Sequence, residues 1–538
     1  MRSKRCRVPA WLSGLLCAVA AGTTAFAMPA GAASEQAGEV RRIEVDLGKA
    51  GAPLDRSFNF SVGGDYAGTM LRPENLAQLR TAVDELGFRY IRFHAIFHDA
   101  LGTVRVVNGK TVYDWSKIDQ LYDAFLKMGI RPFVELGFSP EAMATSKQTI
   151  FYWKGNTSHP ELKAWSALVD AFVRHARARY GAGEVRRWYF EVWNEPNLDG
   201  FWEKADQAAY FELYAASARA IKAIDPALRV GGPATAGAAW VPEFLDYAAQ
   251  RGLPVDFVAT HTYGVDGGFL DENGHDDNKL STNPDAVTAD VRKVRQQIAA
   301  SRFPHIPLYF TEWSASYNPR DPVHDSYISA AYILTKLRAA RTMAQGMSYW
   351  TYSDLFEEAG PPPTPFHGGF GLINREGVRK PAFFAYKYLN QLHGREIASG
   401  DDQSLAATEG KRTGILFWDW QQPKQEISNR PFFTRVLPAQ PARTTELSFA
   451  GLAPGSYRLT VRRTGFHAND AHTRYLEMGS PASLSAAQLA ELQGLTRDTP
   501  EISKPVRVGA DGRYQLRLPM HGNDVVLAVL EPLSAVRK

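Results

Sequence analysis

Between residues 58 and 393, short apolar runs rich in β-branched and aromatic residues alternate with longer segments whose apolar positions recur every three or four residues. The first pattern predicts buried strands and the second predicts amphipathic helices. Such alternation is typical of βα units around a parallel sheet. We predict strands at residues 58–63, 89–94, 131–138, 187–195, 229–233, 256–263, 307–313 and 347–354, and helices at residues 74–86, 116–128, 162–180, 207–224, 285–300 and 326–345.

Eight such units predict an α/β fold, a (β/α)8 TIM barrel over residues 56–394, with its active site at the carboxyl ends of the strands. A doubly wound open sheet is the alternative. It is disfavoured because no glycine-rich dinucleotide or phosphate loop follows the first predicted strand.

The pattern changes after residue 394 to short alternating runs separated by turn residues. This change predicts an accessory antiparallel β-sandwich over residues 395–538, with a short helix at residues 483–495. Residues 40–47, within the segment 34–55, have strand character and are expected to join the sandwich. We expect the sandwich to support the barrel, and carbohydrate binding is the alternative role.

Residues 1–33 combine a basic start, an apolar stretch and the small-residue pattern Ala25-Phe26-Ala27. This arrangement is typical of a secretory signal peptide and is too short to span a membrane. We therefore expect a secreted or periplasmic protein. Cys6 and Cys17, the only cysteines, lie in this leader. The mature chain is thus expected to contain no disulfide.

Charge narrows the class of partner. The 538 residues contain 61 Lys and Arg and 57 Asp and Glu. Cleavage of the leader would remove four of the basic residues and none of the acidic ones, which leaves a formal charge of zero. A balanced surface argues against a nucleic-acid partner. Outside the leader, no apolar run is long enough for a membrane-spanning helix.

Reactive side chains recur at the ends of the predicted strands. In a (β/α)8 barrel these ends converge on one mouth. Each residue alone has an ordinary structural explanation, such as a hydrogen-bonded buried histidine, but packing does not explain why all lie at one rim. Glu191 lies deeper on the fourth strand, and we interpret it as a structural carboxylate paired with an arginine. The strand-end residues are Arg92, His94, Phe138, Asn194, Glu195, His261, Tyr263, Glu312, Trp313, Trp350 and Asp354.

Glu195 and Glu312 form the candidate catalytic pair. Glu195 lies in the run WYFEVWNEPN, and Glu312 lies in YFTEW on the seventh strand. Glycoside hydrolysis uses two carboxyl groups, about 5–5.5 Å apart in retaining enzymes and about 6.5–9.5 Å apart in inverting ones. We expect Glu195 to be the acid/base and Glu312 the nucleophile, with mutual repulsion and burial raising the pKa of the acid. Arg92 or Tyr263 would keep Glu312 ionised, and Asn194 would bind the sugar 2-hydroxyl.

Several motifs together resemble glycoside hydrolase family 39, the β-xylosidase and α-L-iduronidase family, and most closely its bacterial β-xylosidase branch. The Asn-Glu-Pro motif alone indicates only a large group of retaining barrel glycosidases, whereas the combination is far more specific. The motifs are EVWNEPN, YFTEW, RFHAIFHD (92–99), LGFSPE (136–141), THTYG (260–264), YWTYSDLFEE (349–358), PFHGGFGLI (365–373) and YLEMGSP (475–481).

The resemblance implies a subsite for one terminal sugar. It implies a retaining exo-β-xylosidase that releases xylose from the ends of xylo-oligosaccharides without a cofactor, and no metal-binding cluster is apparent in the sequence. The acidic pair Glu357 and Glu358 suits a neutral pentose, whose hydroxyl groups are hydrogen-bond donors. The carboxylate of a uronic acid would instead favour a facing Arg or Lys. An arabinosidase or another exo-glycosidase is the alternative, and a sugar-binding barrel without turnover is the non-enzymatic one. The residues implied are His94 and Asn194 for ring hydroxyls, Phe138 and Trp350 as apolar walls, His261 and Tyr263 beside the nucleophile, and Glu357 and Glu358 for the far hydroxyls.

Overall fold

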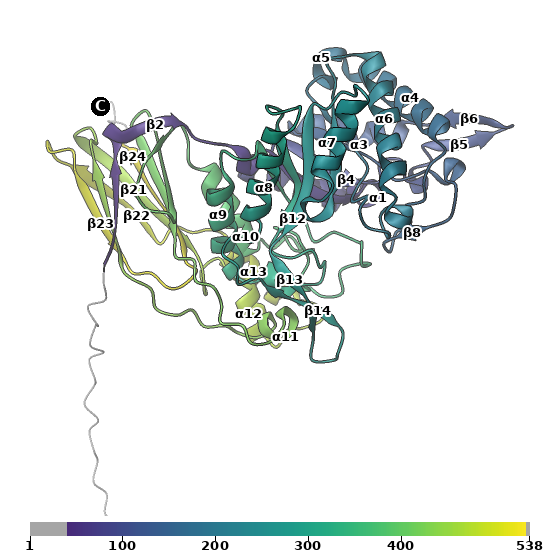
Figure 1. Ribbon diagram of the computed structural model, residues 1–538. Coiled ribbons are helices and arrows are strands. Elements are labelled where there is room, and N and C mark those ends of the chain that lie inside the picture. Colours follow the sequence, from purple (N-terminus) through teal and green to yellow (C-terminus); the bar gives the residue numbers. More distant parts are fainter. Residues whose placement is uncertain (1–39, 534–538) are drawn as a thin grey trace, which may run out of the picture. The chain divides into compact units, whose positions relative to one another are not determined.

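The computed structural model describes residues 40–533, and the expected leader at residues 1–33 lies outside them. Eight parallel strands close into a barrel, and helices surround it (Figure 1). The predicted (β/α)8 fold is confirmed. In order around the barrel, the strands are β3 (Ser61–Tyr66), β4 (Tyr90–His94), β7 (Arg131–Leu136), β10 (Tyr189–Val192), β11 (Arg229–Thr235), β12 (Phe257–Tyr263), β15 (Leu308–Ser314) and β16 (Gly346–Tyr349).

All six predicted barrel helices are present, and two further helices were not predicted. The last predicted helix, 326–345, ends earlier, at Ala340. The helix Pro381–Asn390 gave no amphipathic pattern because almost all of its side chains are buried. The barrel helices are α2 (Pro73–Leu86), α3 (Ser116–Met128), α4 (Leu162–Tyr180), α6 (Gln207–Ile224), α7 (Val241–Gln250), α8 (Thr288–Ala300), α9 (Ile328–Ala340) and α10 (Pro381–Asn390), with short helices α1 (Ala67–Met70) and α5 (Ala182–Val185).

Aromatic rings fill the amino end of the barrel. Phe133 and Tyr189 stack with ring centroids 4.9 Å apart. The Tyr189 hydroxyl also shares a 2.9 Å hydrogen bond with that of Tyr309. These residues lie within the first three positions of β7, β10 and β15. Their packing closes one end of the barrel and leaves the carboxyl ends of the strands for polar side chains.

The C-terminal region contains a seven-stranded and a three-stranded sheet. As expected, the N-terminal strand β1 joins it, but β1 pairs parallel to β20, unlike the other strand pairs of the two sheets. The purple β1–β2 segment therefore lies with the green and yellow C-terminal strands in Figure 1. The sheets are β2 (Ala50–Pro53), β17 (Arg395–Ile397), β18 (Ser404–Glu409), β19 (Arg412–Trp418), β24 (Val525–Pro532), β21 (Gly455–Thr464) and β22 (Ile502–Val508), and β1 (Arg41–Asp46), β20 (Thr445–Ala450) and β23 (Tyr514–Leu518).

The larger sheet shares a hydrophobic core with the barrel. Leu405, Leu416 and Leu527 belong to the same buried cluster as the barrel helices. The indole N–H of Trp418 donates a 2.9 Å hydrogen bond to the Thr335 hydroxyl of α9. The remaining elements are α11 (Asn429–Phe433), α12 (Ala471–Glu477) and α13 (Ala486–Leu495), and the hairpins β5–β6 (Val104–Val107, Lys110–Tyr113), β8–β9 (Thr149–Ile150, Gly155–Asn156) and β13–β14 (Val265–Leu270, Asp276–Leu280).

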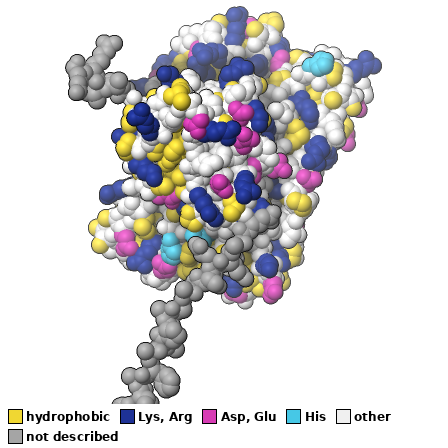
Figure 2. Space-filling view, turned by 90° about the vertical axis from the view of Figure 1, so that its left-hand side faces the viewer, with side chains coloured by type: hydrophobic (Ala, Val, Ile, Leu, Met, Phe, Trp, Pro, Cys, Tyr) yellow, Lys and Arg dark blue, Asp and Glu magenta, His cyan; other side chains and the backbone are white. Residues whose placement is uncertain are grey.

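The predicted helix at residues 483–495 is α13, which begins three residues later. Ser485 caps it, and Gln488 completes a reciprocal capping box. Within residues 40–533, every helix is too short or too polar to cross a bilayer. On the face drawn in Figure 2, Lys and Arg side chains are interspersed with Asp and Glu, as the balanced charge predicts.

Candidate active site

Glu195 lies in a loop rather than in the fourth strand. The predicted strand 187–195 was too long, because β10 ends at Val192. Trp193 and Glu195 then adopt left-handed backbone conformations, with φ of 68° and 47°. The Glu195 N–H donates a 2.8 Å hydrogen bond to the Ala234 carbonyl on β11. This loop turns the carboxyl group toward the barrel mouth, where it is 7% exposed.

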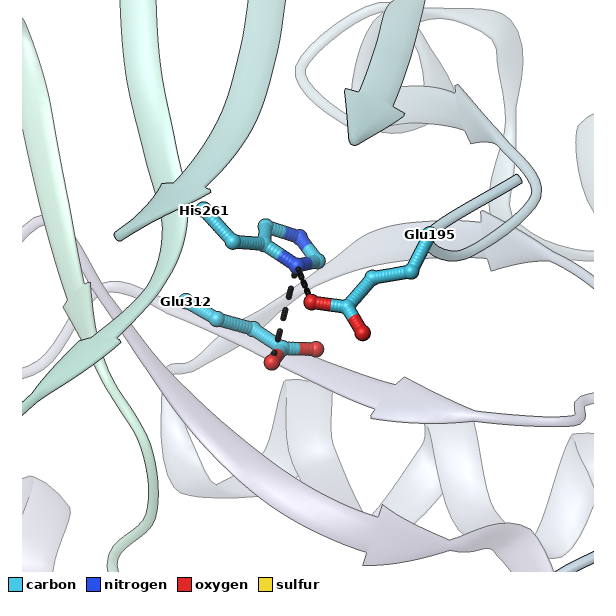
Figure 3. A group of neighbouring side chains, drawn as sticks. All are labelled: Glu195, His261 and Glu312. Atoms are coloured by element: carbon cyan, nitrogen blue, oxygen red, sulfur yellow. Dashed lines mark hydrogen bonds and ion pairs between the residues drawn. The ribbon is translucent and has the colours of Figure 1, made fainter. Parts of the chain in front are cut away.

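Glu312 and Glu195 face each other across His261 (Figure 3). His261 Nδ1 lies 2.9 Å from Glu195 Oε1 and 3.6 Å from Glu312 Oε2. These three atoms all lie within 4.8 Å of one another. Glu195 follows β10, His261 is on β12 and Glu312 is on β15. The barrel thus brings together the two carboxylates that the sequence pattern singled out.

Two donors hold the carboxylate of Glu312. Arg92 Nη1 donates to Oε1 at 2.6 Å, and the Tyr263 hydroxyl donates to Oε2 at 2.7 Å. Arg92 also donates to Glu191 at 2.5 Å and to Asn194 Oδ1 at 2.8 Å. Both oxygens of Glu312 therefore accept a hydrogen bond, one of them from a guanidinium group. Among the described residues, none accepts a hydrogen bond from the Asn194 amide nitrogen, and Asn194 borders the cavity.

Burial raises the pKa of Glu195 to about 7, although the positive charges of His94 and Arg92 oppose the shift. The sequence-based expectation named burial and repulsion from Glu312; burial is the main cause, and repulsion from Glu135 adds to it. Burial also lowers the pKa of His261 to about 3, so its ring is neutral at pH 7. The neighbour of Glu195 is therefore an uncharged imidazole, and a carboxyl group there can hold a proton near neutral pH.

A hydrogen-bonded row crosses the mouth from Glu135 through His94 to Glu358. His94 Nδ1 lies 2.7 Å from Glu135 Oε2, and its Nε2 lies 3.2 Å from Glu358 Oε1. Burial alone would lower the pKa of His94, but Glu135 and Glu358 raise it well above its usual value. Burial raises the pKa of Glu358 to about 8. Of this row, the carboxyl group of Glu358 and the imidazole of His94 line the cavity and can share a proton.

The catalytic pair borders a cavity of about 410 Å³. Trp350, which follows β16, forms a buried wall. Gly63 makes room for it, because a Cβ at this position would lie 2.1 Å from Trp350 Cε3. Leu198 and Tyr317, 40% and 52% exposed, form the outer rim. The lining residues are His94, Asn194, Glu195, Leu198, Phe201, Ala236, Gly237, Tyr263, Val265, Asp290, Glu312, Tyr317, Trp350, Glu358 and Phe370.

Three predicted substrate-binding residues, Phe138, His261 and Glu357, do not line the cavity. Phe138 is buried behind His94, with ring centroids 6.1 Å apart. Glu357 points elsewhere, and its two oxygens accept from Arg72 at 2.5 and 3.1 Å. Neighbouring residues on an irregular loop can face opposite sides, and here only Glu358 reaches the cavity. Arg92 and His261, both fully buried, lie beneath the catalytic pair rather than in the cavity wall.

Sequence reasoning missed the lining residues that come from loops and helices. Strand-end patterns do not mark Tyr317 or Phe370, and Asp290 lies on α8. Leu198 and Phe201 directly follow the Asn-Glu-Pro-Asn motif, and that proximity was a usable signal. Glu135 was also missed, although a carboxylate within an otherwise apolar strand is itself unusual.

Glu195, His261 and Glu312 could also be considered as metal ligands because of their mutual proximity. The donor set does not favour this. Arg92 and Tyr263 already donate to both oxygens of Glu312. The guanidinium charge 2.6 Å from that carboxylate would also repel a divalent cation. The arrangement fits two carboxyl groups that are each hydrogen-bonded to other side chains better than it fits a metal centre.

Comparison with known proteins agrees with this geometry. The profile of glycosyl hydrolases family 39 matches residues 41–515. A β-xylosidase from Caldicellulosiruptor saccharolyticus is 36% identical over 464 residues, which cover 84% of this chain and 91% of that protein. A GH39 enzyme from Xanthomonas axonopodis pv. citri has a crystal structure with a TM-score of 0.92 and 62% identity, covering 94% of this chain and 100% of that one. A monomeric β-xylosidase from Caulobacter crescentus CB15 gives a TM-score of 0.91 and 64% identity, with coverage of 92% and 100%. The resemblance inferred from the motifs is confirmed, and the chain belongs to glycosyl hydrolases family 39 and is a glycoside hydrolase.

Proposed function

We propose that this glycoside hydrolase is a retaining exo-β-xylosidase that releases xylose from the non-reducing ends of xylo-oligosaccharides. One observation carries the proposal. Glu195 and Glu312 face one cavity in unlike surroundings, since Glu312 accepts hydrogen bonds from Arg92 and Tyr263 while the carboxyl of Glu195 neighbours a neutral imidazole. Unlike environments assign an acid and a nucleophile to two chemically identical side chains.

The distance between the two carboxyl groups supports double displacement. One oxygen of Glu195 and one of Glu312 lie within 4.8 Å of each other. An inverting enzyme needs about 6.5–9.5 Å between the two carboxyl groups to admit a water molecule. A pair this close leaves room for the anomeric carbon to bond to Glu312 directly.

The proposed reaction has two steps. Glu312 attacks the anomeric carbon while Glu195 gives its proton to the departing glycosidic oxygen, so one C–O bond forms and one breaks. Glu195, now ionised, then takes a proton from water, whose oxygen displaces Glu312 from the sugar. The free amide nitrogen of Asn194 can donate to the 2-hydroxyl oxygen, where hydrogen bonds strengthen in the transition state.

The cavity wall supports a neutral pentose as the terminal sugar. Glu358 and His94 can exchange hydrogen bonds with hydroxyl groups. The nearby Arg92 already donates to Glu191, Glu312 and Asn194, so it is not free to bind the carboxylate of a uronic acid. The two solved or curated relatives named as β-xylosidases are consistent with this choice. Trp350 and His94 are buried, whereas Leu198 is exposed at the rim. This difference in depth supports binding of one sugar at a chain end.

A panel of aryl glycosides tests the proposal. Wild-type protein should cleave the β-D-xyloside best, ahead of the α-L-arabinoside, β-D-glucoside and α-L-iduronide. On xylobiose, whose leaving group needs a proton, the Glu312→Ala and Glu195→Ala variants should each lose about 10²-fold or more in kcat/KM. If either variant kept full turnover, the assignment of the pair would be wrong. Preference for another glycoside would overturn only the sugar specificity.

We also propose that the protein acts outside the cytoplasm, on the strength of the leader pattern at residues 1–33. Expression of the full chain in a bacterial host should give a processed form in the periplasm or medium. Mass spectrometry of its N-terminus would identify the cleavage site. An unprocessed protein confined to the cytoplasm would contradict the proposal.

A further inference from the structure

A short segment of the C-terminal region holds the β13–β14 hairpin, which borders the active-site cavity through Val265. Residues 426–430 contact both strands of the β13–β14 hairpin. The Ser428 hydroxyl donates to the Leu270 carbonyl at 2.8 Å, and the Arg430 N–H donates to Asp277 at 2.8 Å. Arg430 also pairs with Asp271 at the tip of the hairpin. The hairpin is thus held by the C-terminal region as well as by the barrel strand that precedes it.

Asn429 occupies the centre of this contact and is fully buried. Its Oδ1 accepts from the Leu280 N–H of β14 at 2.9 Å. Its Nδ2 donates to Asp321 at 2.7 Å, in the loop that follows β15. One amide therefore connects the hairpin to the loop after the strand that bears the proposed nucleophile.

The same two segments meet again at the cavity. The Tyr317 hydroxyl, from the loop after β15, donates to Asn278 Oδ1 of β14 at 2.8 Å. Tyr317 and Val265 both line the cavity, and Val265 pairs with Leu280 in the hairpin. The residue held by Asn429 is therefore the direct strand partner of a cavity-lining residue.

Apolar packing reinforces this connection. Phe432 and Phe433 of α11 form one buried cluster with Leu280 and Ala315. The cluster joins α11, β14 and the end of β15, so a shift of α11 would move both segments that carry Tyr317 and Asn278. Tyr317 itself is half exposed and depends on these neighbours for its position.

We propose that Asn429 is a positioning residue that fixes the leaving-group side of the active site through the Tyr317–Asn278 pair, so that a second pyranose ring is held against Tyr317. The inference rests on the proposed xylosidase function for the identity of that ring. An exposed aromatic ring at the mouth offers an apolar face and a polar edge, which suits a sugar. The C-terminal region thereby contributes to substrate selection without contacting the reacting atoms.

Two substrates separate this role from a general structural one. Xylobiose places a sugar on the leaving-group side, whereas β-xylosyl fluoride has no sugar there. In Asn429→Ala, kcat/KM for xylobiose should fall by about five- to tenfold, chiefly through KM, the size of one lost hydrogen bond. The fall for the fluoride should be less than about twofold. The Asn429→Asp variant keeps the acceptor for Leu280 but loses the donor to Asp321. Its kcat/KM for xylobiose should therefore also fall.

A double variant tests whether Asn429 acts through Tyr317. Asn429→Ala combined with Tyr317→Ala should be no worse on xylobiose than Tyr317→Ala alone, because coupled residues are not additive. Asn469→Ala, a buried amide of the C-terminal region that bonds to Arg463 and Asp498, controls for lost stability and should not change the ratio of the two substrates. Equal losses on both substrates, or multiplicative effects in the double variant, would overturn the inference. If wild type cleaved neither xylosyl compound, the proposed function would fail, and the disaccharide and fluoride of the sugar it does cleave would decide the role of Asn429.

Discussion

Glu195 and Glu312 have the same side chain and differ only in their neighbours. Arg92 and Tyr263 donate to Glu312, whereas the hydrogen-bond partner of Glu195 is His261, whose pKa burial lowers to about 3. The two carboxyl groups thus differ in their surroundings, and burial favours a proton on Glu195. This difference at the residue scale is the basis of the proposed acid and nucleophile.

The pKa of Glu195 predicts the alkaline limit of activity. Burial raises this pKa to about 7, and the acid must be protonated to assist a poor leaving group. We expect kcat/KM on xylobiose to fall as the pH rises through about 7. A pH profile of kcat/KM checks this, with the stability of the protein verified at each pH. A rate that stayed constant up to about pH 9 would contradict the assignment of Glu195 as the acid.

Two adjacent glutamates should behave differently, because one faces the cavity and the other does not. Glu358→Gln should lower kcat/KM by about 10- to 100-fold, as expected when a hydrogen bond that involves a charged group is lost. Glu357→Gln should change it by less than about threefold, since its partner Arg72 is 41% exposed and such pairs contribute little. Steady-state kinetics on an aryl xyloside compares the two variants. Equal losses of kcat/KM in the two variants would contradict the inference that only Glu358 faces the cavity.

At the scale of elements, the loop between β16 and α10 carries Glu358 and Phe370 into the cavity. Lys380, at the start of α10, is fully buried and anchors this loop. Its Nζ donates to Asp325 at 2.8 Å, to Asp354 at 2.9 Å and to the Gly369 carbonyl at 2.7 Å. A buried cation with several partners fixes the loop on both sides of the residues that line the cavity.

Removing that cation should destabilise the protein strongly. Lys380→Met would leave the buried carboxylates of Asp325 and Asp354 without a counter-charge, which typically costs about 3–5 kcal/mol. Denaturant unfolding of the variant and the wild type measures the difference. Lys127→Met, at an exposed position of α3, should change stability by less than about 0.5 kcal/mol. A loss below about 1 kcal/mol for Lys380→Met would contradict the structural role given to this residue.

The elements differ in how well the sequence predicts them. Strands β4, β12 and β15 lie within one residue of prediction. The fourth strand was predicted too long, since Trp193 continues the apolar pattern while its backbone has turned left-handed. Helix α10 was missed because burial on all sides removes the amphipathic signal.

Side-chain direction in loops limited the prediction of the site. The strand positions placed Glu195, Glu312 and His94 at one mouth, and the structure brings them to one cavity. Sequence spacing does not show that Glu357 turns to Arg72 while Glu358 faces the cavity. The rim residues come from segments far apart in the chain, so only the folded arrangement reveals them.

At the scale of the whole molecule, the barrel and the C-terminal region depend on each other. Leu405 and Leu527 belong to the main buried cluster, and Trp418 bonds to Thr335 of α9. A chain that ends after residue 394 would expose this apolar surface on the barrel helices. We expect such a chain to be largely insoluble and to lack a cooperative thermal transition, as circular dichroism would show. A truncated barrel with the unfolding temperature of the full chain would contradict the shared core.

Covalent trapping tests the central claim most directly. In a 2-deoxy-2-fluoro-β-xyloside, the fluorine slows both steps because it removes the 2-hydroxyl contacts and destabilises the oxocarbenium-like transition states. An activated leaving group restores the rate of the first step, so the glycosyl-enzyme accumulates. Peptide mapping of the inactivated protein by mass spectrometry then locates the sugar. We predict one fluoroxylosyl group per chain, attached to Glu312, and no labelling of the Glu312→Ala variant. Attachment to another residue, or turnover of xylosides without any adduct, would contradict the proposed retaining mechanism.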